Sequence, residues 1–140
     1  MGVSASKRWV GAALFVGLIY FVAGLTVSAL AGAATSHQMV VTWRLVGWLA
    51  SAVAFAAHIG YEQFRSRHAP AATALHASLA VALGACALAV AATLRAVVTE
   101  TGSPRLLTLA IVVWPAMAGV PAFLVALAVA SVLARRRRPG

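Results

Sequence analysis

Acidic residues are almost missing from this sequence. Asp and Glu together number 2 against 11 Lys and Arg, and charged residues make up 9% of the 140 positions, whereas a soluble domain carries about 25%. Hydrophobic residues make up 63%. So few charges cannot cover a water-soluble fold of this size, which excludes a soluble enzyme, a disordered chain and a nucleic-acid-binding module. The composition predicts an integral membrane protein.

Cysteine and catalytic motifs are also scarce. The single cysteine, Cys86, lies inside an apolar run, so it can form no internal disulfide and no paired-thiol redox centre. The sequence contains no recognisable Ser-His-Asp set, glycine-rich phosphate loop or zinc motif. We therefore expect no enzymatic activity.

Long apolar runs dominate what is present. Crossing a hydrocarbon core of about 30 Å takes roughly 20 helical residues, and four runs reach that length, at about 9–34, 39–62, 74–98 and 106–134. Their richness in Ala and Leu and their lack of polar alternation argue against strands. Because the connections are short, we predict a single all-α domain over 1–140, with four transmembrane helices in an up-down-up-down bundle and a basic tail at 135–140.

Basic residues gather on one side of this predicted bundle. The N-terminus, the second connection and the C-terminus hold eight of them: Lys7, Arg8, Arg65, Arg67 and the four at 135–138. The opposite side holds Arg44, Arg95 and Arg105. By the positive-inside rule both termini are cytoplasmic, in a plasma (inner) membrane, and the terminal arginines would attract anionic lipid headgroups.

Polar groups inside the apolar runs are the first places to look for function. On the second helix, a stripe at i, i+3 and i+4 spacing falls within an arc of about 80°; its members are Arg44, Gly47, Ser51, Phe55, His58, Glu62 and Arg65. His76, near the start of the third helix, should lie at the same depth as His58. We therefore expect His58, Glu62 and His76 to converge, either as a structural group or as ligands of a haem or a metal ion.

Two further sets of residues carry alternatives. Arg44 and Arg95 lie on the predicted outer side, where they either anchor helix ends or form a paired basic site for an anionic solute or lipid headgroup. Pro115 and Pro121 predict a kink or a break in the fourth helix, as seen in transporters and also in ordinary membrane helices.

The first helix carries a row of small residues, Gly24, Ser28 and Gly32, at the spacing that lets another helix approach closely. This row favours a non-catalytic bundle that packs against partners, as an accessory subunit or a homo-oligomer. A carrier or channel for a small solute is the alternative, supported by the polar stripe and the prolines. A haem- or metal-binding redox protein using His58 and His76 is the second alternative.

Overall fold

Four long helices make up nearly all of the described chain. The computed structural model describes residues 3–66, 69–100 and 103–136. Over these ranges it has no strand, and its elements are α1 (Val3–Gly32), α2 (His37–Tyr61), the π-helical turn η1 (Glu62–Ser66), α3 (Pro70–Val98) and α4 (Pro104–Arg136). Each α-helix is long and apolar enough to cross a membrane. The predicted class, an all-α membrane protein with four candidate spans, is confirmed at this level.

Local signals set the helix ends. Ser36 caps α2, its hydroxyl oxygen accepting the backbone N–H of Met39 at 3.2 Å. Pro70 and Pro104 begin α3 and α4, where the missing N–H costs nothing. The four helices start two to six residues before the predicted 9, 39, 74 and 106. At the other end of the chain, α4 continues to Arg136, into the predicted tail, whose residues 137–140 lie outside the described ranges.

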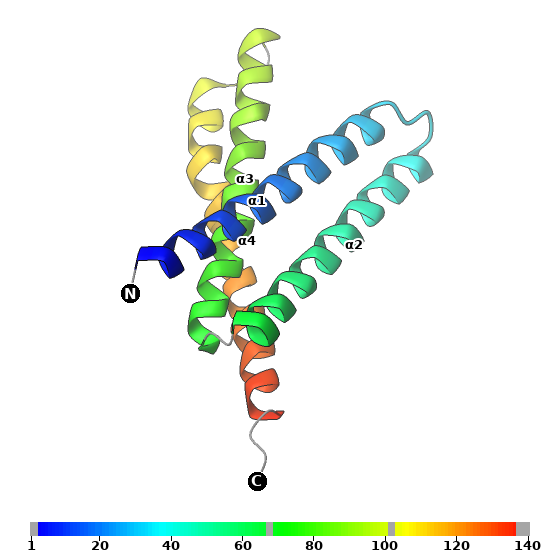
Figure 1. Ribbon diagram of the computed structural model, residues 1–140. Helices are drawn as coiled ribbons and strands as arrows, with labels where there is room; N and C mark the ends of the chain where they lie inside the picture. The colour runs from blue at the N-terminus through cyan, green and yellow to red at the C-terminus, as the bar shows by residue number, and fades with distance from the viewer. Residues whose placement is uncertain (1–2, 67–68, 101–102, 137–140) are drawn as a thin grey trace.

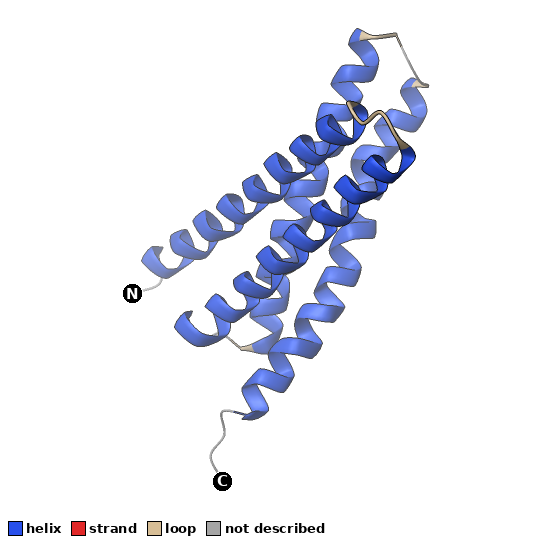
Figure 2. Cartoon of the chain, turned by 90° about the vertical axis from the view of Figure 1, so that its right-hand side faces the viewer, coloured by secondary structure: helices blue, strands red, loops and turns tan. Residues whose placement is uncertain are grey.

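The helices form two packed pairs that cross each other. Figure 1 shows α3 and α4 side by side, with α1 and α2 running diagonally across them. Figure 2 shows from the side that the same four long helices form one bundle. In this arrangement α1 contacts both α2 and α3, whereas α2 meets α3 and α4 much less extensively.

Small residues bring the helices together. A Cβ on Gly17 would lie 3.2 Å from the carbonyl oxygen of Ala80, and one on Gly84 would lie 2.7 Å from the Cβ of Tyr20, so α1 and α3 touch almost backbone to backbone. Between α3 and α4, Gly119 faces Ala82 in the same way. Close approach of this kind supplies van der Waals contact where lipid provides no hydrophobic driving force.

The buried core is accordingly built mainly from alanine. Five alanines on α3 and α4 have no exposed surface: Ala74, Ala77, Ala80, Ala126 and Ala130. Most of the large apolar side chains point outward, as expected where the surrounding solvent is hydrocarbon.

The fourth helix bears on one of the two alternatives that its prolines left open, a kink or a break. Pro115 and Pro121 both lie inside α4, which continues through them without a break. A proline removes one backbone hydrogen bond, and in a membrane bundle neighbouring helices make up for that loss. Of the two alternatives, the break is therefore absent, and the kink stays a prediction.

Candidate functional site

A group of buried polar residues lies where α2, η1 and α3 meet. Five such side chains are buried: His58, Glu62, Gln63, Thr73 and His76. We call these five residues the polar cluster. Burying so many polar groups in an apolar bundle is costly unless they satisfy one another, so their contacts decide what the cluster can do.

The π-helical turn places two of these residues. The backbone N–H of Glu62 is shared between the carbonyl oxygens of His58 and Ile59, four and three residues earlier, and the π-helical turn η1 begins at this residue. Such wider turns are frequent at functional sites. Because the next helix begins at Pro70, η1 lies directly against the start of α3. The Gln63 amide Nε2 then donates to the Thr73 hydroxyl at 2.9 Å.

The centre of the polar cluster is a carboxylate–imidazole pair. His76 Nδ1 lies 3.2 Å from Glu62 Oε2, and the two side chains are only 11% and 3% exposed. The Trp9 ring covers the His76 ring in a near-parallel stack, with centroids 4.5 Å apart and planes inclined by 6°. One contact set therefore joins α1, η1 and α3.

His58 completes the group from the last turn of α2. It is buried, interacts electrostatically with both Glu62 and His76, and its Nε2 atom has no hydrogen-bond partner. A buried ring nitrogen without a partner costs stability, so it is the one polar atom here that structural pairing leaves unexplained. The convergence of His58, Glu62 and His76 expected from spacing is therefore present in the fold.

The polar contacts of Glu62 and His76 within the polar cluster are made by internal pairing. Within the described ranges, no three His, Cys, Asp or Glu side chains are grouped so that they could hold a metal ion. His76, one of the two histidines considered as ligands, has its Nδ1 on Glu62 and its ring face against Trp9. What the pair can do chemically is share a proton between carboxylate and imidazole while clamping three elements together.

Sequence reasoning overlooked three members of this arrangement. Gln63 and Thr73 could have been found from the sequence. Gln63 directly follows Glu62, and Thr73 lies three residues before His76 on the same helix face. Trp9 carried no such signal in the sequence, because its stack on His76 depends on how α1 crosses α3.

The other predicted residues lie apart from the polar cluster. Arg44 and Arg95 are both exposed, on α2 and α3, and their pairing in one basic site stays a prediction. In the small-residue row, a Cβ on Gly24 would lie 2.6 Å from Leu88 Cδ1, so this position contacts α3. Ser28 is exposed, and a Cβ on Gly32 would meet nothing within 4 Å. Only the first member of the row is therefore a helix contact within the chain.

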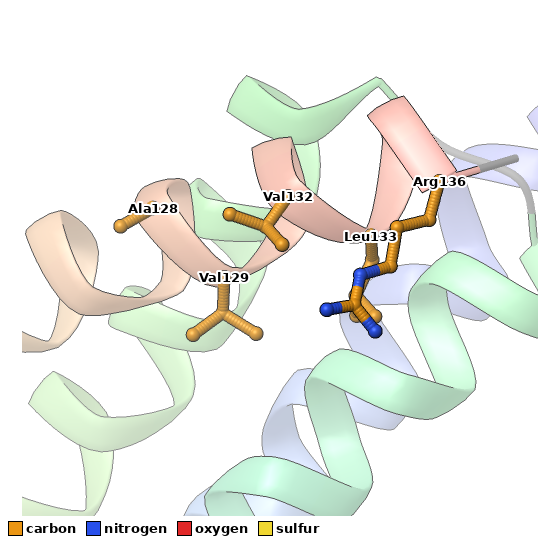
Figure 3. Close-up of a pocket in the computed structure, with 5 residues that line it drawn as sticks. All are labelled: Ala128, Val129, Val132, Leu133 and Arg136. Carbon is orange, nitrogen blue, oxygen red and sulfur yellow. The ribbon is translucent and has the colours of Figure 1, made fainter. Parts of the chain in front are cut away.

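The surface of the described residues includes two hollows that bear on function. One, of about 430 Å³, lies between α2 and the other three helices and is lined by aromatic and small residues. The other, of about 390 Å³, lies at the end of α4 and is lined by Ala128, Val129, Val132, Leu133 and Arg136. Figure 3 shows the Arg136 guanidinium beside Leu133, at the edge of this apolar surface.

Comparison with known proteins adds no assignment to this geometry. No family model matches the chain, and no curated protein or solved structure matches it.

Proposed function

We propose that this protein is a non-catalytic subunit of a membrane assembly, which acts by packing its second helix against a second copy or another membrane protein. The proposal places it in the plasma (inner) membrane as an up-down-up-down bundle with both termini cytoplasmic. The distribution of basic residues, eight on one side and three on the other, supports that orientation.

The observation that carries the proposal is the exposure of α2. No residue in the most apolar 18-residue window of this helix is buried, whereas the corresponding windows of the other three helices are partly buried. Trp48, at mid-helix, is 80% exposed. A helix attached mainly to one neighbour has most of its surface available to a partner.

A row of small residues on α2, which we call the α2 seam, offers a contact surface to that partner. Ala52, Ala56 and Gly60 follow one another at i+4 spacing; the two alanines are exposed, and a Cβ on Gly60 would meet nothing within 4 Å. Small residues at this spacing let two membrane helices approach closely. The opposite side of α2 is already used, since a Cβ on Gly47 would lie 2.8 Å from Val27 of α1.

Lipids are the second class of partner in this proposal. The hollow at the end of α4 combines an apolar wall, Val129, Val132 and Leu133, with the Arg136 guanidinium (Figure 3). Such a surface suits a phospholipid whose acyl chain follows the helix and whose anionic headgroup meets the arginine.

Native mass spectrometry from lipid nanodiscs tests the assembly. We expect a mass of at least two chains for the native protein when it is expressed alone, and a monomer for Ala56→Trp, because a bulky ring on the seam prevents close approach. The matched control is Ala116→Trp, at another exposed alanine on α4, which should leave the assembly intact. A monomeric native protein that also co-purifies with no other membrane protein would contradict the proposal.

A further inference from the structure

His58 is the member of the polar cluster whose place internal pairing does not explain. The residue is 6% exposed, and its Nε2 atom is buried without a hydrogen-bond partner. Glu62 and His76 both act on it electrostatically, yet the Glu62 Oε2 atom lies against His76 Nδ1. Two buried imidazoles therefore depend on a single carboxylate.

No second carboxylate of the chain can reach the polar cluster. The sequence holds two acidic residues, and the other one, Glu100, follows the far end of α3. At a rise of about 1.5 Å per residue, the helix carries Glu100 about 35 Å away from His76. Glu62 is therefore the one acid of this chain that can balance a positive charge at this end of the bundle.

The elements packed around this end bring no further negative charge. From α1 the Trp9 ring stacks on His76, and α4 packs apolar side chains, Leu133 among them, against the core at this end. Among the described residues, the ionisable groups that act on His58 are Glu62 and His76. The charged residues of α1 and η1 besides Glu62, and those of α4, are all basic: Lys7, Arg8, Arg65, Arg105, Arg135 and Arg136. None of these segments therefore supplies a charge that could balance a second imidazolium.

A proton on both imidazoles is thus incompatible with the packed arrangement. In a protonated imidazole both ring nitrogens are donors, and His58 Nε2 faces no acceptor. The charge itself would be buried and unbalanced, which is costly in an apolar interior. If η1 moves away from α3, water can accept from the imidazolium and solvate its charge. The separated form therefore binds the second proton more readily than the packed form.

We propose that the polar cluster is a pH-sensitive contact, which holds η1 against α3 while at most one of its two imidazoles is protonated and opens when both are. Because the open form takes up the proton, the contact needs no cavity in its closed form. Linkage then requires acid to favour opening and higher pH to favour closing, over the range in which an ordinary histidine titrates, about pH 6.5. The device lies at one end of the bundle and does not depend on assembly through the α2 seam.

Amide hydrogen exchange in nanodiscs tests the proposal, measured by mass spectrometry at about pH 7.5 and about pH 5.5 and corrected for the intrinsic effect of pH on exchange. We expect opening of the amides at 74–80, in the first turns of α3, to increase about 3- to 10-fold at the lower pH, since one proton gives at most about tenfold per pH unit. His58→Phe should abolish this increase, and so should His58→Gln, a second neutral variant. His37→Phe, at an exposed histidine on the same helix, is the matched control and should keep it.

Three results would overturn the proposal. The first is equal opening of 74–80 in the native protein at the two pH values. The second is an increase at low pH that a folded His58→Phe or His58→Gln protein retains. The third is an equal increase at 88–95, in the last turns of α3, because acid would then loosen the whole helix and not this contact.

Discussion

Glu62 and His76 show how a few polar residues can determine the packing of an otherwise apolar bundle. Their side chains are nearly enclosed and lie 3.2 Å apart, on elements joined by a short connection. In a low-dielectric interior, removing one partner leaves the other buried without its pair, which lowers the free energy of unfolding by about 3–5 kcal/mol. Because Trp9 stacks on the same imidazole, losing the pair would also weaken the packing of α1 against α3.

The two acids of the chain offer a matched test of this idea. We expect Glu62→Ala to destabilise the folded protein by about 3–5 kcal/mol, since it leaves the buried His76 without its carboxylate. Glu100→Ala removes an exposed carboxylate from the turn after α3 and should change stability by less than about 0.5 kcal/mol. Thermal unfolding of both variants in the same detergent measures the difference. Equal unfolding temperatures would show that the pair does not hold the bundle together.

At the scale of single residues, most of the candidate site could be predicted from the sequence. The i+4 spacing of His58 and Glu62 and the matched depth of His76 predicted which residues converge. The stack of Trp9 could not be predicted in this way, because it requires the crossing angle of α1 over α3. That angle follows from close contacts such as Gly17 on Ala80 and Gly84 on Tyr20, whose partners lie far apart in the sequence.

At the scale of the element, each helix uses its small residues differently. In α1, Gly24 lies against Leu88 while Gly32, two turns later, faces open space. The sequence placed both in one row because helical spacing identifies a face and does not tell which part of that face a neighbour covers. In α4, two prolines predicted a kink or a break, and the helix continues through both without a break.

Leucine at the two glycines separates a covered position from an open one. Gly24→Leu should destabilise the bundle by about 1–3 kcal/mol, because the new side chain must displace Leu88. Gly32→Leu places the same side chain in open space and should cost less than about 0.5 kcal/mol. Guanidinium or thermal unfolding in detergent compares the two variants. A Gly24→Leu protein as stable as the Gly32→Leu protein would mean that α1 and α3 are not in close contact there.

For the whole molecule, apolar run length and composition were sufficient to predict the fold class. Each of the four apolar runs is long enough to cross a membrane, and each corresponds to a candidate span in the structure. The ends of these spans differ from the predicted ones by a few residues, with a cap or a proline at the starts of α2, α3 and α4. The crossing of the α1–α2 pair over the α3–α4 pair (Figure 1) was not predictable from one sequence. It depends on long-range contacts between alanine-rich surfaces, which look alike on every side of a helix.

Our central proposal is that the chain crosses a membrane four times and that both of its termini are cytoplasmic. Labelling of single cysteines in intact cells tests it directly, in a Cys86→Ala background. We expect Gln38→Cys and Ser103→Cys, at exposed positions before and after the middle pair of spans, to react with a membrane-impermeant maleimide. Ala69→Cys, exposed between those spans, should react only after permeabilisation. Labelling of Ala69→Cys alone in intact cells would contradict the orientation, and labelling of all three there would contradict four crossings.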